Sequence, residues 1–476
     1  MYIKRCCRKV AVACMLFLTG WLTGCGDRQN QMPTDDVSFY QPSEYADEDY
    51  NSIDSRWCFA RSKESEHFFL FWEPGFGDDP NAEYISEDMR VDTDDLLEKA
   101  EQFYRTNATK LGFSDGELLY GYKLQIYLMY ERDWLATGAG YDNKIGALWI
   151  SPMTCQPVGS VIAHEIGHAF QYLIYCRQLA EGMEDRSESG FRYGYPGSNG
   201  GNALWEICAQ WQSWKDYPEE AFTDYEMETW FEHYHRSLEN ELSRYQNYWF
   251  FYYLEETQGA AALQRIWNES RYPEDCYSVY MRLYLNDDLN LFYDQLFQYA
   301  VRTVTFDYDE IRAYSQPYQG RYDTILYDTG DGFWQVAYTD CPEANGFSVV
   351  AVPLDEGTSE VTVYFRGLAP GSTLAEGDPG SYFVGEELVA EKDCYNPYTG
   401  VPGWRYGFVS LLQNGTSVYG EMHDEPEGTV TFEIPNGTVH LYFVVLGAPE
   451  EYVCHGWDDT EENDVQMPYA LKIQCR

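Results

Sequence analysis

The chain has 476 residues, a length that favours more than one domain, and its 44% hydrophobic content leaves ample material for cores. Its 32 basic and 78 acidic residues give a net charge of −46. Because such a surface repels phosphates and anionic headgroups, functions in nucleic-acid binding are excluded.

The N-terminus has the pattern of a lipoprotein signal peptide, residues 1–24. A basic start with Lys4 and Arg5 precedes a short apolar stretch, residues 10–22, which ends in the run Leu22-Thr23-Gly24-Cys25. This stretch is too short to span a bilayer comfortably. The run resembles a bacterial lipobox, which implies cleavage before Cys25 and a membrane anchor through lipid on its thiol. We therefore expect the protein in the bacterial cell envelope, at the outer membrane or cell surface. A secretory peptide without lipidation is the alternative.

Residues 25–55 are polar and acidic and predict a flexible tether. Apolar runs then predict strands at residues 67–73, 124–130 and 145–150, and helical spacing predicts a helix over residues 91–111. A polar loop is expected through residues 138–142, between the second and third of these strands.

A helix that follows Pro157 and runs to about Arg177 contains the motif H-E-x-x-H, formed by His164, Glu165 and His168. Residues four apart share a helix face, so the two imidazoles can bind one Zn²⁺, and Glu165 can act as general base. Gly167 costs helix stability, which suggests a close approach there. A buried helix with two satisfied histidines is the alternative interpretation.

In zinc proteases of this kind, the strand before the motif helix is an edge strand that pairs with an extended substrate. The strand at residues 145–150 therefore makes Ala147 and Trp149 candidate substrate-binding residues. An interior strand at this place is the competing possibility.

The site needs a third protein ligand, because a catalytic zinc commonly has three and one open position. Gln171 and Ile174 occupy the places where a metzincin needs Gly and His, which excludes that class. Glu206 lies in an apolar helical run, where a carboxylate needs a partner, and it is the favoured ligand. Glu188, in a polar loop, is the alternative. Gln210, one turn after Glu206, is a candidate partner for a ligand.

Helical patterns continue to about residue 313, and strands separated by Gly and Pro follow from residue 322. We therefore predict two domains, residues 56–318 and 322–476, of which the second is an all-β, jelly-roll-like sandwich. The Asn414-Gly415 and Asn436-Gly437 pairs each predict a tight hairpin. The acidic run at residues 458–464 is either a solvated loop or a Ca²⁺ site.

Several segments together resemble a family of bacterial lipoproteins that are classed as gluzincin-type zinc peptidases and are largely uncharacterised. They are residues 67–73, 75–80, 136–152, 163–171 and the pair Trp205-Glu206. The resemblance covers roughly residues 57–315. It implies an α+β, zincin-like catalytic domain with a helical second half, and it favours Glu206 as the third ligand.

The resulting hypothesis is a lipid-anchored zinc metallopeptidase that acts on a peptide or protein. Glu165 takes a proton from the attacking water, with zinc held by His164, His168 and Glu206. Gluzincins usually add a Tyr or His that supports the oxyanion, and the candidates here are His233, His235, Tyr245 and Tyr248. The alternative function is a surface lipoprotein that binds glycan or protein on aromatic residues such as Trp404 and has a non-catalytic zincin-like domain.

Overall fold

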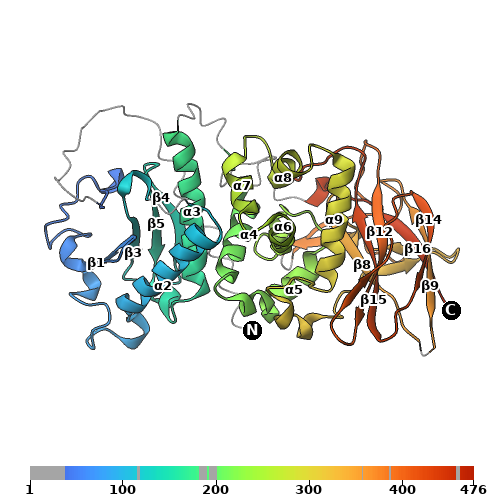
Figure 1. Cartoon of the computed structure of the whole chain (residues 1–476), viewed down its shortest axis with the longest axis horizontal. Coiled ribbons are helices and arrows are strands. Elements are labelled where there is room, and N and C mark those ends of the chain that lie inside the picture. Colours follow the sequence, from blue (N-terminus) through green and yellow to red (C-terminus); the bar gives the residue numbers. More distant parts are fainter. Residues whose placement is uncertain are drawn as a thin grey trace. The chain divides into compact units, whose positions relative to one another are not determined.

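The computed structural model describes residues 38–114, 118–181, 190–191, 201–355, 357–384, 387–456 and 461–476. The predicted signal peptide, Cys25 and the start of the predicted tether lie outside them. Residues from Phe39 to Arg476 form one compact unit of α+β architecture. An N-terminal mixed sheet is followed by a group of helices and then by two packed antiparallel sheets (Figure 1).

The N-terminal sheet has the strand order β1-β2-β3-β5-β4. Its strands are β1 (Ser62–Glu64), β2 (Phe68–Trp72), β3 (Leu124–Leu128), β4 (Ala136–Tyr141) and β5 (Ile145–Ile150). β2, β3 and β5 are parallel, whereas β1 and β4 run antiparallel at the two edges. The strands predicted near residues 67, 124 and 145 are therefore confirmed, but the loop predicted through residues 138–142 is wrong because most of it forms β4.

Both faces of this sheet are covered, as the alternation of β2 shows. Phe68, Leu70 and Trp72 share a core with α2 (Thr93–Arg105) and α3 (Ser160–Ala180). Phe69 and Phe71 point to the opposite face, where Tyr45, Tyr50 and Trp57 pack on them. The prediction of a flexible tether through residue 55 is thus wrong from Phe39 onward, because its aromatic side chains bury themselves against the sheet.

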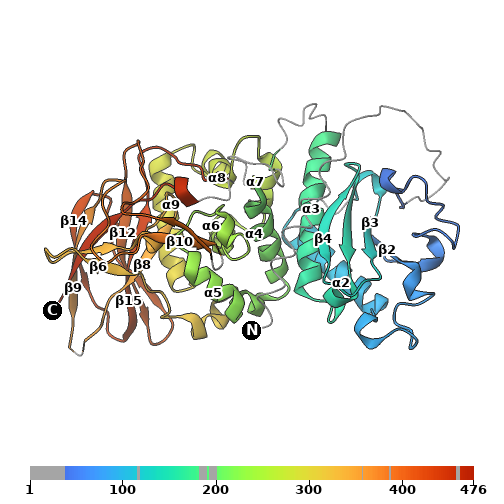
Figure 2. The same ribbon diagram turned by 180° about the vertical axis from the view of Figure 1, so that it is seen from behind.

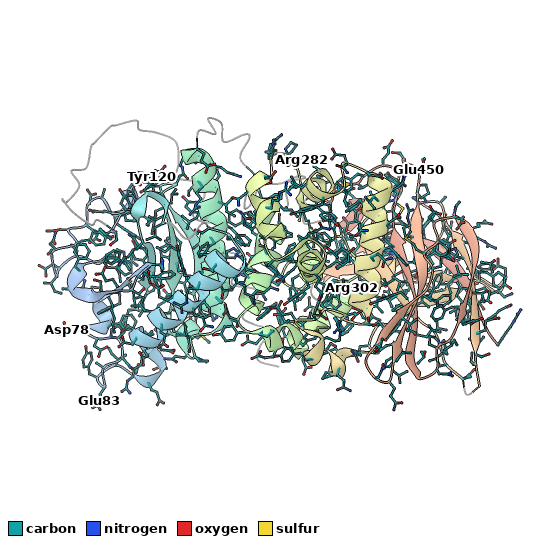
Figure 3. The ribbon with its side chains drawn as sticks, viewed as in Figure 1. Asp78, Glu83, Tyr120, Arg282, Arg302 and Glu450 are labelled. Atoms are coloured by element: carbon teal, nitrogen blue, oxygen red, sulfur yellow. The ribbon has the colours of Figure 1, made fainter. Side chains whose placement is uncertain are left out.

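The central helices follow α3 in the order α4 (Gly201–Trp214), α5 (Asp224–His233), α6 (Trp249–Gln258), α7 (Ala262–Glu269), α8 (Cys276–Tyr284) and α9 (Leu289–Val304). Their inner faces share one apolar core with α3. Arg302, labelled in Figure 3, lies on α9 and forms an ion pair with Glu256 on α6, which links two of these helices.

Two antiparallel sheets make up the C-terminal part (Figure 2). One has the order β13-β12-β15-β8, with β13 (Ser417–Tyr419), β12 (Trp404–Leu412), β15 (Thr438–Gly447) and β8 (Phe347–Ala351). The other has the order β14-β9-β16-β7-β6, with β14 (Glu427–Glu433), β9 (Glu360–Gly367), β16 (Tyr469–Cys475), β7 (Trp334–Val336) and β6 (Leu326–Asp328). A separate pair is β10 (Ser381–Val384) and β11 (Glu387–Glu391).

The two large sheets enclose a shared core, so this part is a β-sandwich. On β15, Phe443 and Val445 point into that core, whereas Tyr442 and Val444 join the core of the helices. α9 packs on β12 and β15 from the helical side. The secondary structure therefore changes at the predicted boundary near residue 320, but the apolar core continues across it.

The two predicted Asn-Gly hairpins have different outcomes. Gly415 has a positive φ of 82° between β12 and β13, which pair as a hairpin. Gly437 also has a positive φ, of 84°, but its neighbours β14 and β15 pair in different sheets. That prediction is wrong because the turn crosses between the sheets of the sandwich. Among the described residues, no helix combines the length and the apolar character needed to cross a membrane.

Candidate metal centre

The motif helix α3 packs directly against α4, and the two helices approach each other closely at Gly167. A Cβ atom at Gly167 would lie 3.3 Å from Ala209 Cα and 2.9 Å from Gln212 Oε1, both on α4. A larger residue would push the helices apart. The expected close approach at Gly167 is therefore present, and it brings the polar side chains of the two helices within reach of each other.

The two motif histidines and Glu206 converge at this crossing. His164 Nε2 lies 3.1 Å and His168 Nε2 3.2 Å from the same Glu206 oxygen, Oε2. All three residues are buried, and one ligand atom from each lies within 4.8 Å of the other two. The structure thus brings together the two imidazoles and the carboxylate that the sequence favoured.

Glutamine side chains fix the outer nitrogens of both imidazoles. His164 Nδ1 lies 2.7 Å from Gln210 Oε1, and His168 Nδ1 lies 2.9 Å from Gln171 Oε1. An amide oxygen only accepts, so each Nδ1 carries a proton and Nε2 is the nitrogen that faces Glu206 and that a metal would bind in place of a proton. That tautomer is the one a metal ligand needs. Gln210 was expected near a ligand, whereas the role of Gln171 was missed.

Gln171 is itself held in place by α4, and α4 is in turn hydrogen-bonded to the π-helical turn Thr106–Lys110 that follows α2. Its Nε2 donates to Gln212 Oε1 at 2.9 Å and to the Trp205 carbonyl oxygen at 3.2 Å. Gln212 Nε2 in turn donates to Asn107 Oδ1 at 2.6 Å. A buried chain of amides therefore sets the orientation of His168. The sequence signal for it was a glutamine three residues after a motif histidine in an otherwise apolar helix.

Glu165 lies between α3 and the edge strand β4. Burial raises the pKa of its carboxyl, opposed by the two neighbouring imidazoles and by the backbone N–H of Gly138, which hydrogen-bonds to it. A Cβ atom at Gly138 would lie 2.1 Å from the Glu165 carbonyl oxygen. Glycine at this position of β4 is what lets the strand lie against α3 beside the motif.

The charges at the crossing complement one another. Burial disfavours the Glu206 carboxylate, yet the two imidazoles hold the pKa of Glu206 well below its usual range. Burial also opposes the charged imidazole, but Glu206 overcomes it and raises the pKa of His168 to about 9. An anionic oxygen facing two imidazole nitrogens is a donor set that Zn²⁺ accepts.

Ala147 and Trp149 do not lie at a free strand edge, so their prediction as rim residues is wrong. β5 lies between β3 and β4: Ala147 pairs with Gln125 on one side and Ala139 on the other. The Trp149 Nε1 donates to Tyr141 Oη at 3.0 Å. The chain reverses direction between β4 and β5, so β4 occupies the edge position that was expected of β5. The glycines of β4 are typical of a loop, and for that reason the sequence did not indicate this strand.

Of the four residues considered for oxyanion support, Tyr245 is placed next to the triad. Its ring centroid lies 6.2 Å from that of His164. The Tyr248 hydroxyl instead donates to the Ala221 carbonyl oxygen at 2.8 Å. His235 is buried and His233 is partly buried beside Arg236, and desolvation together with that guanidinium lowers the pKa of His233 to about 3. Glu188, the alternative third ligand, lies outside the described residues.

A family of unknown function, DUF6055, matches residues 31–475, and the chain belongs to this family. No curated protein matches the sequence. Similar solved structures include a xylan-binding domain from carbohydrate-binding module family 22 and the C-terminal family 22 module of Clostridium thermocellum Xyn10B. Each has 12% identity, a TM-score of 0.17, and coverage of 33% of this chain and 81% of that chain. A family GH115 4-O-methyl-α-glucuronidase has 7% identity and a TM-score of 0.14, covering 68% of this chain and 46% of its own. TM-scores this low assign neither fold nor function.

Proposed function

We propose that this member of the DUF6055 family is a zinc metallopeptidase with a zincin-like catalytic domain of the gluzincin type. The observation that carries the proposal is the convergence of His164 Nε2 and His168 Nε2 on one Glu206 oxygen, at 3.1 and 3.2 Å. The outer nitrogens are already committed to glutamine oxygens, so the donor atoms face inward as a metal ligand set requires.

His164, His168 and Glu206 would hold the Zn²⁺. A bound zinc supplies Lewis acidity, which lowers the pKa of water and polarises the scissile carbonyl. Glu165 accepts the proton of the attacking water and returns it to the leaving amine, a role that its burial favours because burial raises its pKa. Tyr245, beside His164, is the candidate that supports the developing oxyanion.

The substrate in this proposal is an extended peptide that pairs with β4. This strand pairs with β5 along one edge, and no other described strand pairs with β4. Backbone hydrogen bonds at such an edge hold a peptide whatever its sequence. Because Gly138 binds Glu165, a peptide on this edge lies beside the general base. The lipid anchor at Cys25 and the envelope location remain part of the proposal.

The test combines metal analysis with cleavage of a broad peptide library. The wild-type chain is expected to retain zinc in the triad and to cleave. Glu165→Gln should keep that zinc and lose activity by about 10²–10⁴-fold, because only the proton transfer is removed. Glu98→Gln, at an exposed site on α2, is the matched control and should be fully active. A wild-type chain that binds no metal and cleaves nothing, or a Glu165→Gln chain as active as wild type, would overturn the proposal.

A further inference from the structure

The turn between β4 and β5 is hydrogen-bonded to an N-terminal strap, residues 39–45. Asp142, the first residue of this turn, accepts with Oδ2 from the Tyr40 hydroxyl at 2.9 Å and from the Ser43 backbone N–H at 2.7 Å. The Ser43 hydroxyl donates to the other oxygen, Oδ1. One carboxylate therefore receives three hydrogen bonds from residues that lie 99 and 102 positions earlier in the sequence.

The backbone of the turn fixes where this carboxylate lies. The Lys144 N–H donates to the Tyr141 carbonyl oxygen at 2.9 Å, which closes a turn around Asp142 and Asn143. Their φ angles are 53° and 56°, and positive φ at both central residues is the signature of the tight turn that joins two antiparallel strands. Asp and Asn tolerate this conformation better than most residues. The Asp142 side chain thus leaves the chain at the point where β4 ends.

The motif helix contacts the same turn from the other side. The Asn143 N–H donates to the Tyr172 hydroxyl on α3 at 2.9 Å. A Cβ atom at Gly140 would lie 2.3 Å from the Tyr172 ring, so this ring lies directly against β4. The end of β4 is therefore held between α3 and the N-terminal strap.

The N-terminal strap is itself bound to the sheet. Gln125 Nε2 on β3 donates to the Tyr40 carbonyl oxygen at 2.6 Å. The Tyr141 hydroxyl at the end of β4 donates to the Tyr45 hydroxyl at 2.7 Å, and both side chains are buried. The strap therefore contacts a central strand as well as the edge strand, and it can fix the position of one relative to the other.

These contacts matter because β4 is the strand proposed to receive a peptide. Gly138 and Gly140 lie within it, and glycine loses more conformational freedom on folding than any other residue. A glycine-rich edge strand therefore needs outside contacts to keep its backbone in register. Near its start, the Gly138 N–H is bound to Glu165. At its end, the strap and Tyr172 hold the turn, so the strand is ordered before a peptide arrives, which favours binding.

We propose that Asp142 is a positioning residue for peptide binding: it joins the N-terminal strap to the β4–β5 turn, and this junction keeps β4 in the conformation that accepts a peptide strand. The effect falls on substrate affinity, because Asp142 lies at the end of the strand, whereas the candidate zinc ligands lie on α3 and α4. The inference rests on the proposed peptidase function for its substrate, but the order of β4 can be measured without a substrate.

Hydrogen exchange followed by mass spectrometry measures the order of β4 in the purified full chain. In Asp142→Asn, the amides of β4 and the turn should exchange about tenfold faster than in wild type, because local opening controls their exchange. Asn tolerates the positive φ and keeps one acceptor oxygen, but its amide nitrogen cannot accept from the strap. Asp47→Asn, at an exposed position two residues after the strap, is the matched control and should exchange as wild type does. Equal exchange of the β4 amides in Asp142→Asn and wild type would overturn the proposal.

Peptide cleavage provides the functional measurement. For a peptide that the wild type cleaves, Asp142→Asn should raise KM about three- to tenfold and leave kcat within about twofold, because strand alignment contributes to binding and not to the chemical step. An unchanged KM, or a loss of kcat together with zinc, would contradict the proposal. A wild-type chain that cleaves no peptide would refute the proposed function, whereas the exchange comparison still decides whether Asp142 holds β4.

Tyr40→Phe is a milder variant that leaves the turn itself unchanged. It removes one donor to Asp142 but keeps the ring, whose centroid lies 4.8 Å from Lys144 Nζ. The β4 amides should exchange faster than in wild type and slower than in Asp142→Asn. Tyr314→Phe, at an exposed position, is its control and should change nothing. Equally accelerated exchange in β3 and β4 would indicate a general loss of stability and would contradict a role confined to the edge strand.

Discussion

The α3–α4 crossing and the group formed by Glu343, His455 and Asp464 both bring imidazole and carboxylate side chains together, but the chain builds them differently. At the crossing, two candidate ligands lie four residues apart on one helix and the third is one helix further along. In the other group, Glu343 lies before β8, whereas His455 and Asp464 both lie in the connection between β15 and β16. The comparison teaches that helical spacing lets a candidate metal site be recognised in the sequence, whereas side chains that loops bring together by tertiary packing leave no such pattern.

The largest expected effect comes from changing the carboxylate at the α3–α4 crossing. Glu206→Gln should lose zinc at the crossing, with a loss of affinity beyond the roughly 10–100-fold of an outer-shell change. The amide has a single acceptor oxygen and no charge to balance the cation. Isothermal titration with Zn²⁺ and peptide cleavage measure the loss.

Glu188→Gln is the control for that experiment, because Glu188 is the competing third ligand. It should bind zinc as wild type does. If Glu188→Gln loses zinc and Glu206→Gln retains it, then the third ligand is Glu188 and not Glu206.

Glu226 offers a contrast with Glu206, because its buried carboxyl is hydrogen-bonded to a neutral amide, whereas that of Glu206 faces two imidazoles. Burial raises the pKa of Glu226 to about 7, although Gln246 Nε2 donates to it at 2.8 Å. In the unfolded chain this carboxyl loses its proton near pH 4.5, so the folded state binds more protons between these values. Its stabilisation is complete below about pH 4.5 and is lost as pH rises through about 7, a change of about 3 kcal/mol.

Urea unfolding of wild type and Glu226→Gln at several pH values checks this expectation. The free energy of unfolding of wild type should fall relative to that of the variant between pH 4.5 and 7, and the difference should then be constant. A difference between the two chains that does not change with pH would contradict the raised pKa.

Gly138→Ala tests whether the edge strand must lie against the motif helix. The new Cβ atom would meet the Glu165 carbonyl oxygen at 2.1 Å, and helix backbone cannot move aside as a flexible side chain can. We expect a loss of stability of about 1–3 kcal/mol, together with weaker peptide cleavage. Gly159→Ala is the control, because its Cβ would meet only the Pro157 carbonyl oxygen at 4.0 Å. Similar stability of the two variants would show that β4 is free to shift.

The smallest expected effect concerns the amide that orients His164. Gln210→Ala removes the acceptor 2.7 Å from His164 Nδ1 and should weaken zinc binding by about 10–100-fold. Gln258→Ala, at an exposed position on α6, should leave the zinc affinity unchanged. Competition with a chromogenic zinc chelator measures the zinc affinity of both variants. Equal affinities would show that Gln210 does not support zinc binding by His164.

Most of the crossing could be predicted because its determinants are local. The motif fixes two side chains on one helix face, and a carboxylate in an apolar helix needs a partner, which pointed to Glu206 and to Gln210 beside it. The edge strand could not be predicted in this way. A run rich in glycine predicts a loop, and only the fit of Gly138 against the Glu165 backbone explains why that run is a strand.

The N-terminal segment shows the same limit. Its polar composition predicted a tether, yet Tyr45 and Tyr50 fill the open face of the sheet next to Phe69 and Phe71. Composition averages over a segment, whereas packing depends on which few side chains meet an uncovered apolar surface.

The sequence by itself determined the helix that carries His164, Glu165 and His168, the carboxylate that faces them, and the alternation of strands that makes the C-terminal sandwich. Only the tertiary structure decided that β4 is the edge strand, that Gln171 orients His168, and that His455 meets Glu343 and Asp464. The physical reason is the sequence separation over which each kind of interaction acts. A helix turn or a strand repeat fixes neighbours within a few residues, but contacts between distant segments depend on how apolar faces are covered.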